Sequence, residues 1–166
     1  SDLDYNLKGM NYWGAGFRNM TNNVRPITEP DDLKNIKMRT LQAPTILATY
    51  RAYGANPTAM AFTEVYNGLQ QGVVEGQENP LANIASMKFQ EVQKYLTQTH
   101  HTYHTYASVM NKDAWDSLTP ELQEVVSNAF EVARDYAREL TIEDEKQILA
   151  EISDQIEIIE LTDDGR

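Results

Sequence analysis

The sequence contains no cysteine among its 166 residues. Disulfides, thiolate metal sites and cysteine nucleophiles are therefore excluded, and an oxidising compartment carries no penalty for the chain. Long apolar runs are also missing, because none reaches the roughly 18 residues that can span a bilayer. The glycine-rich phosphate loop and the short motifs of zinc proteases and serine hydrolases are absent as well. The sequence thus offers no familiar signature of catalysis.

The first residue is Ser1 rather than an initiator methionine, and no charged-then-apolar signal segment precedes the first predicted strand. We therefore expect a chain that is processed, cut or engineered at its start.

Basic charge is scarce, and the net charge is −11. From Thr119 onward there are 14 acidic and 4 basic residues, whereas residues 1–118 carry 11 and 10. Nucleic acid and anionic membrane surfaces require a basic face, so neither is expected as a partner. The acidic last third is predicted to be the solvated back of a helix, and the nearly neutral remainder can still hold a local positive pocket.

What the sequence does contain is an alternation of strand and helix patterns in a chain of single-domain size. The predicted strands cover 10–22 with its loop, 36–41, 56–60, 73–77, 100–111 and 156–161. The predicted helices cover 43–54, 62–72, 80–89 and Thr119 to about residue 153, with a turn over 28–35. Thr63 and Thr119 are expected to cap helices that follow them, and Gly54 and Gly72 to end helices. The alternation predicts an α/β fold with a parallel or mixed sheet.

Asn79 stands between a predicted strand and a helix that is expected to begin at Pro80. In open α/β sheets, ligands bind beyond the carboxyl ends of strands and close to helix N-termini. The amide of Asn79 can therefore either face a ligand or simply cap the helix, and the pattern leaves both interpretations open.

Two arginines lie near other predicted strand ends. Arg18 follows Gly14 and Gly16, which allow a close backbone approach, and Arg39 lies near the end of the strand 36–41. A guanidinium group matches a carboxylate with two parallel hydrogen bonds, which lysine cannot form. From the pattern alone, the simpler interpretation of Arg39 is a structural ion pair with an acidic residue at the rim of the sheet.

Two further patterns are weaker. His100 and His104 have a metal-binding spacing on a helix, but on the predicted strand they would be roughly 13 Å apart, so no metal site is expected. Glu75 and Glu78 could form a carboxylate pair for acid–base catalysis, but no nucleophile lies nearby in the sequence, and a polar pair at a strand end is the simpler interpretation. We therefore expect neither an enzyme nor a cofactor.

The segment PTAMAFTEVYNGLQQGVVEGQENPLANIASMKFQEVQKYLTQTHH, residues 57–101, resembles the DctP-type solute-binding proteins of tripartite ATP-independent periplasmic (TRAP) transporters. Residues 54–80 and 88–96 fit the family pattern almost position by position, although Gly68 replaces the usual alanine and Glu75 the usual aspartate. The upstream segment GFRNMTNNVRPITEPDDLKNIKMR is also similar, with Asn35 in place of glycine.

The resemblance implies a periplasmic α/β protein of the periplasmic-binding-protein-like type II fold, a two-lobed Venus flytrap that closes on an organic acid. Such a receptor delivers its ligand to the TRAP membrane permease. The residues that the resemblance implies for the ligand site are Arg39, which would grip the carboxylate, and Arg18, Asn79, Phe62, Gln42 and Tyr106.

The resemblance also implies that the chain starts in the middle of the family's fold. Residues 17–105 and 145–166 would form the second lobe, and 1–16 and 106–144 would be remnants of the first lobe and the long connecting helix. The alternative is a standalone lobe that pairs with the missing N-terminal half or another chain and acts as an interaction module.

Overall fold

The computed structural model describes residues 5–162, which form a six-stranded mixed sheet in the order β3-β2-β4-β1-β5-β6. β2 pairs in parallel with β3 and β4, β5 pairs in parallel with β6, and β1 runs antiparallel to β4 and β5. The strands are β1 (Leu7–Asn22), β2 (Lys37–Thr40), β3 (Asn56–Ala59), β4 (Gly76–Pro80), β5 (Tyr95–Asn111) and β6 (Glu157–Glu160). The α/β prediction is confirmed.

Five α-helices and three short 3-10 turns connect the strands. They are η1 (Pro30–Leu33), α1 (Pro44–Ala52), η2 (Phe62–Glu64), α2 (Val65–Gln70), α3 (Leu81–Ser86), η3 (Phe89–Glu91), α4 (Lys112–Asp116) and α5 (Pro120–Ile152). Thr119 caps α5 as predicted, because its hydroxyl accepts a hydrogen bond from the Leu122 amide. Within residues 5–162, no helix is both long enough and apolar enough to cross a membrane.

The core consists of two apolar clusters on opposite faces of the sheet. Met20 belongs to one cluster, with α1 and η1, and Leu96 belongs to the other, with α2, α3 and the end of α5. Leu96 pairs with Thr21, the residue after Met20, so the pleat turns the two side chains to opposite faces. Helices on both faces bury all of β4 and residues 18–22 of β1, and polar side chains on these segments must therefore find partners inside the protein.

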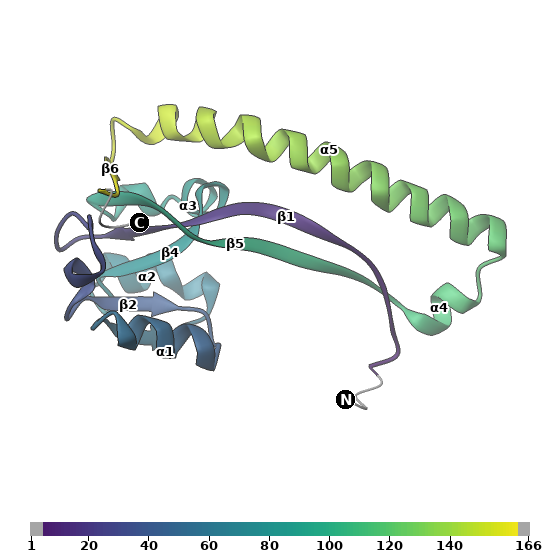
Figure 1. The fold of residues 1–166 in the computed structure, drawn as a ribbon, viewed down its shortest axis with the longest axis horizontal. Coiled ribbons are helices and arrows are strands. Elements are labelled where there is room, and N and C mark those ends of the chain that lie inside the picture. Colours follow the sequence, from purple (N-terminus) through teal and green to yellow (C-terminus); the bar gives the residue numbers. More distant parts are fainter. Residues whose placement is uncertain (1–4, 163–166) are drawn as a thin grey trace.

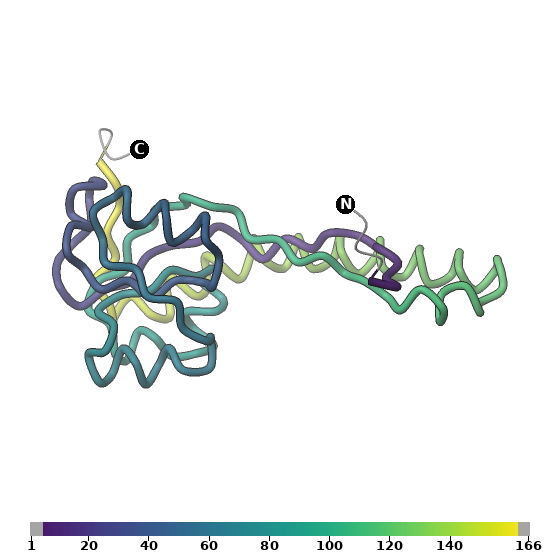
Figure 2. The backbone as a smooth tube through the Cα atoms, turned by 90° about the horizontal axis from the view of Figure 1, so that it is seen from below, coloured from purple at the N-terminus to yellow at the C-terminus, as the bar shows by residue number. Residues whose placement is uncertain are grey.

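The long strands β1 and β5 continue beyond the sheet as a two-stranded ribbon, which leads to α4, and α5 returns alongside it toward the lobe (Figure 1). Figure 2 shows the ribbon and α5 extending together to one side of the compact lobe. Large apolar side chains remain exposed on the ribbon and on α5: Leu7, Tyr12, Phe17, Tyr103, Tyr106, Val109, Leu122, Val125, Val132, Tyr136, Leu140 and Ile142.

The predicted strand over 73–77 is wrong, because β4 begins only at Gly76. Gly72 adopts a left-handed conformation with φ of 69°, and the amides of Val73 and Val74 both donate to the carbonyl of Gly68. These bonds close the C-terminus of α2 and take the amides that a strand would have used. β4 is consequently shifted along the chain and includes Asn79.

Other boundaries also differ from the predictions. β5 starts at Tyr95, five residues before the predicted strand, and bends at His100, whose φ is 45°. The helix expected over 80–89 ends at Ser86, because Lys88 is left-handed and opens η3. Thr63 caps no helix, since it lies inside η2, and α2 starts without a side-chain cap.

Gly76 is the first residue of β4 and pairs with both β1 and β2, where there is no room for a side chain. A Cβ there would lie 2.6 Å from both the Sδ of Met38 and the carbonyl oxygen of Thr21. We expect Gly76→Ala to lower the free energy of unfolding by about 2 kcal/mol, because overpacking a buried site forces backbone shifts. Urea denaturation measures this loss. Gly9→Ala is the control and should be nearly neutral, because nothing lies within 4 Å of a Cβ at that position.

Candidate functional site

A cavity of about 500 Å³ lies beyond the carboxyl ends of β2 and β3. β2 supplies Arg39, and Gln42 follows shortly after this strand. Met60 comes from the turn after β3, and Phe62 is the first residue of η2. The structure thus brings together Arg39, Gln42 and Phe62, which the resemblance implied as site residues.

Arg39 is 1% exposed and is held by the main chain rather than by an acid. Its Nε and Nη2 both donate to the carbonyl oxygen of Met60, at 3.0 and 2.8 Å, and the Phe62 ring centre lies 6.0 Å from the guanidinium carbon. Within residues 5–162, no carboxylate lies within salt-bridge distance of Arg39, so the interpretation as a structural ion pair is wrong.

The remaining nitrogen of this guanidinium, Nη1, is buried and has no hydrogen-bond partner among the described residues. Burial lowers the pKa of Arg39, the negative charge of Glu78 raises it and the positive charge of Arg18 lowers it again. An arginine nonetheless stays protonated in proteins, so the cavity contains a buried cation with an unused donor. Such a group costs free energy until an acceptor or an anion binds it.

Arg18, in contrast, is fully engaged by protein groups. Its Nε pairs with Oε2 of Glu78, and its Nη2 donates to Oε1 of Glu78 at 2.9 Å and to the Glu78 carbonyl oxygen at 2.7 Å. Nη2 also lies 3.2 Å from Oδ1 of Asn79, and Nη1 lies 3.0 Å from Nδ1 of His104. Burial, followed by the charge of Arg18, lowers the pKa of His104, so its Nδ1 can accept this bond.

Two side chains complete the surroundings of Glu78 from the α1 side of the sheet. Nε2 of His101 lies 3.5 Å from Oε2 of Glu78, and the hydroxyl of Tyr50 lies 3.4 Å from the same nitrogen. Burial raises the pKa of Glu78, but hydrogen bonds from His101 and Arg18 lower it, and the net value is below the ordinary one. Burial, with a further contribution from Glu78, raises the pKa of Tyr50 well above its ordinary value.

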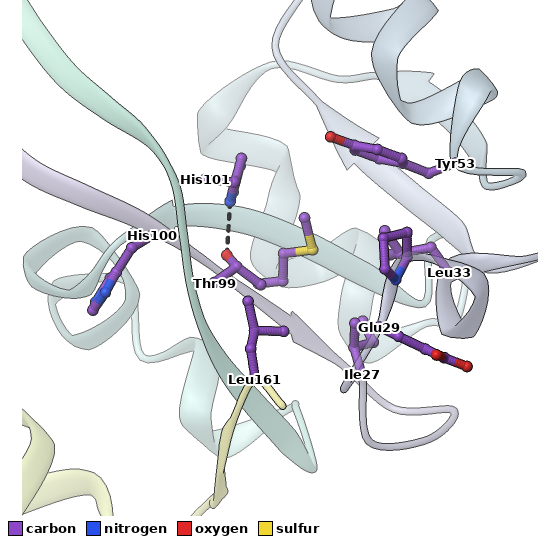
Figure 3. A pocket seen from close by; sticks show the side chains of 10 residues that line it. Ile27, Glu29, Leu33, Tyr53, Thr99, His100, His101 and Leu161 are labelled. Carbon is purple, nitrogen blue, oxygen red and sulfur yellow. Dashed lines mark hydrogen bonds between the residues drawn. The ribbon is translucent and has the colours of Figure 1, made fainter. Parts of the chain in front are cut away.

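His101 also borders a second cavity, of about 380 Å³, on the α1 side of the sheet (Figure 3). Its Nδ1 lies 2.7 Å from the hydroxyl of Thr99, the bond drawn as a dashed line in Figure 3. Both ring nitrogens of His101 therefore have protein partners. The other residues that line this cavity are mostly apolar, and the two polar ones among them, Glu29 and His100, are exposed. The full set is Met20, Ile27, Glu29, Pro30, Leu33, Tyr53, His100 and Leu161.

Asn79 lies in β4 opposite Asn19 of β1, and the interpretation of Asn79 as a helix cap is wrong. The residue at the cap position of α3 is Pro80, and no side chain there accepts a bond from the helix. Oδ1 of Asn79 faces Arg18 and the amide of Asn83, at 3.2 and 3.3 Å, and its Nδ2 donates to Oε1 of Gln77 at 2.5 Å.

Tyr106 lies away from the Arg39 cavity. It is on the ribbon, pairs with Trp13 of β1, and borders a separate pocket of about 280 Å³ beneath α5. Its ring meets that of His104 edge to face, with centroids 4.7 Å apart, and His104 contacts Arg18. Tyr106 is therefore linked to Arg18 only through His104, and it does not line the Arg39 cavity.

The two weaker hypotheses are not supported by the geometry. The His100 ring contacts the Phe17 ring at a tilt of 49°, whereas His104 faces Arg18, and the described residues contain no cluster of three potential metal ligands. Glu75 accepts a bond from the Lys37 amide, whereas Glu78 is engaged by Arg18. The two carboxylates therefore have different partners and do not form a catalytic pair.

Sequence reasoning missed several participants, namely Glu78 as the partner of Arg18, the flanking His101 and His104, and the Met60 carbonyl. The alternation of side chains between the two faces of a strand could have indicated part of this arrangement. Residues 77 and 79 share one face of β4, and residue 78 points to the other, which assigns Glu78 to the opposite side from Asn79.

The mixed sheet, with helices on both faces, is that of a periplasmic-binding-protein-like fold. The sequence profile of the family described as bacterial extracellular solute-binding protein, family 7 (DctP), matches residues 2–166. The chain belongs to this family.

Two curated relatives illustrate the similarity. The 2,3-diketo-L-gulonate-binding periplasmic protein YiaO of Escherichia coli is 41% identical over 143 residues, which are 86% of this chain and 44% of that protein. The C4-dicarboxylate-binding periplasmic protein DctP of Rhodobacter capsulatus is 38% identical over 162 residues, or 96% and 48%. The chain spans about half the length of these relatives.

A solved structure confirms the fold class. The TRAP periplasmic solute-binding protein of Sulfitobacter sp. NAS-14.1, with bound β-D-galacturonate, superposes with a TM-score of 0.91 at 34% identity. The match covers 96% of this chain and 53% of that one.

Proposed function

We propose that this chain forms the acid-binding half of a TRAP solute receptor, in which Arg39 binds the carboxylate of a small organic acid. The observation that carries the proposal is the free Nη1 of Arg39, a buried cationic donor beside a cavity. Since Met60 occupies the Nε side of the guanidinium, a carboxylate would bind its Nη1–Nη2 end.

The remaining residues have supporting roles in this proposal. Phe62 offers an apolar face beside the guanidinium, and Gln42 a polar side chain at the mouth of the cavity. Arg18 contributes positive charge but is neutralised by Glu78, so it supports Asn79 rather than forming the primary ion pair. Relatives that bind diketogulonate, C4-dicarboxylates or galacturonate share the carboxylate that this geometry requires.

We also propose the division into lobes. Residues 17–105 and 145–166 belong to one lobe, and 1–16 and 106–144 to the other lobe and the connecting helix; of these, 1–4 and 163–166 lie outside the described residues. The apolar side chains that remain exposed on the ribbon and α5 are the surface that a first lobe would cover. Closure of that lobe would exclude water and strengthen the Arg39 ion pair.

In this proposal the receptor works in the periplasm and delivers its acid to the TRAP permease. Its relatives YiaO and DctP are periplasmic binding proteins. The absence of cysteine is compatible with that oxidising compartment.

The test is a thermal-shift screen of organic acids, each paired with its neutral amide. The chain is assayed alone and together with the N-terminal half that relatives of twice its length carry. An acid at 100 times its dissociation constant should stabilise the protein by about 2.7 kcal/mol, and its amide should not. Equal shifts with acids and amides, or no shift in either preparation, would contradict a carboxylate receptor. Self-association without acid binding would instead favour the interaction module.

A further inference from the structure

Four buried polar side chains form a continuous hydrogen-bonded chain through the lobe, from Asn79 to Gln93. Nδ2 of Asn79 donates to Oε1 of Gln77 at 2.5 Å, and Nε2 of Gln77 donates to the hydroxyl of Thr21 at 2.9 Å. The Thr21 hydroxyl donates to Oε1 of Gln93 at 2.8 Å. All four residues are at most 4% exposed, so water cannot replace these partners.

At the Asn79 end of this hydrogen-bonded chain, the contact with Arg18 fixes which atoms donate and which accept. Arginine has only donors, so the Asn79 atom beside Nη2 of Arg18 must be the oxygen. The nitrogen of Asn79 therefore points to Gln77, which must present its own oxygen in return. Gln77 then has only its nitrogen left for Thr21.

The other end is fixed independently. Nε2 of Gln93 donates to the main-chain carbonyls of Val92 and Glu75, at 3.1 and 3.4 Å, and a carbonyl can only accept. Gln93 must therefore turn its oxygen to Thr21, whose hydroxyl donates to it and accepts from Gln77. Both ends require the same direction, and no amide in the chain can rotate by 180° without breaking at least two bonds.

We propose that Gln77, Thr21 and Gln93 are positioning residues, which fix the side-chain amide of Asn79 so that it can offer a ligand only an N–H donor. This inference rests on the proposed function, together with the ligand-site role that the family resemblance implies for Asn79. Oδ1 of Asn79 is engaged by Arg18 and Asn83, whereas one hydrogen of Nδ2 has no partner among the described residues. The site therefore selects a ligand with an acceptor at this point, as a carboxylate or a hydroxyl oxygen is.

The test breaks the chain in its middle, at a distance from the ligand. Thr21→Val removes the hydroxyl with almost no change of shape, so Gln77 loses its acceptor and its amide can rotate. We expect the affinity for the acid found in the screen to fall about tenfold, the effect of losing one hydrogen bond. Thr21→Ser keeps the hydroxyl and should bind within about twofold of the wild type.

Thr97→Val is the matched control for burial. Thr97 is also a fully buried threonine on a neighbouring strand, but its hydroxyl has no partner among the described residues. This variant should keep its affinity. If Thr21→Val does not fold, Gln93→Met breaks the same chain at its far end and replaces it in the test.

A second readout needs no ligand. In NMR spectra of the wild type and of Thr97→Val, the hydrogen-bonded side-chain amide protons of Gln77 and Asn79 should be protected from solvent exchange, and Thr21→Val should remove the protection of both. Protection of Asn79 that persists in Thr21→Val overturns the inference, as does unchanged affinity. If no acid binds the wild type, the proposed function fails, and the NMR result still decides whether the chain positions Asn79.

Discussion

Arg39→Ala is expected to weaken the binding of the organic acid on the order of 100-fold, or about 3 kcal/mol. Truncating one partner of a buried, hydrogen-bonded charge pair has an effect of this size, because the ligand carboxylate would lose the cation that binds it. The fold should survive, since Nη1 is an unsatisfied buried donor in the absence of ligand. Arg39→Ala also leaves the Met60 carbonyl without its two donors, so we expect the free energy of unfolding to fall by about 1–3 kcal/mol.

Isothermal titration calorimetry measures this loss. Arg39→Lys should rescue poorly, because an ammonium group cannot donate to the Met60 carbonyl and also present a planar pair of donors to a carboxylate. Arg25→Ala is the control. Arg25 also donates to main-chain carbonyls, those of Asp32 and Lys34, but lies outside the cavity. Wild-type affinity in Arg39→Ala, or an equal loss in Arg25→Ala, would contradict the assignment.

Glu78→Gln is expected to lower the free energy of unfolding by about 3 kcal/mol. The Glu78 side chain is 2% exposed and neutralises Arg18, which is 3% exposed. Removing the negative charge while preserving the shape leaves a buried, uncompensated guanidinium, and broken buried pairs typically cost 3–5 kcal/mol. Urea denaturation measures the change. Glu75→Gln, three residues earlier and less buried, still accepts the Lys37 amide and should stay within about 0.5 kcal/mol of the wild type.

The same carboxylate should make the stability of the fold depend on pH. Burial raises the pKa of Glu78, but His101 and Arg18 lower it to a net value below the ordinary 4.5. A carboxyl group whose pKa is lowered in the folded state contributes stability that is fully present above its unfolded pKa. That contribution is lost as the pH falls below about 4.5 and through the folded pKa. Unfolding free energies of Glu78→Gln should decline less over this acidic range, and a parallel decline in both proteins would contradict the role of Glu78.

The alternation of apolar patterns was enough to predict the α/β class, the long helix and most strands, because burial on two faces imposes strong periodicity. It did not locate β4, since the two valines at 73 and 74 are typical strand residues whose amides are used to close α2. The end of the helix at Gly72 was predicted, but the sequence pattern does not show that the next two amides close the helix and do not start a strand.

The site was predictable in its residue types but not in its partners. Arg39 and Arg18 look alike in the sequence, at strand ends with polar neighbours. The structure distinguishes them, because Arg18 meets Glu78 across the antiparallel pair of β1 and β4, 60 residues away in the chain. Among the described residues, Arg39 donates hydrogen bonds only to the Met60 carbonyl, in a turn whose backbone no side-chain pattern specifies. Which arginine remains available to a ligand is thus decided by long-range pairing.

The most direct test of the account is the position of the carboxylate in a crystal structure of the protein with its acid bound. We predict a carboxylate oxygen at about 2.8 Å from Nη1 of Arg39, with the Met60 carbonyl still on the Nε side and the pair of Arg18 and Glu78 intact. An acid that instead displaces Glu78 to bind Arg18, or that leaves Nη1 of Arg39 without an acceptor, would contradict it.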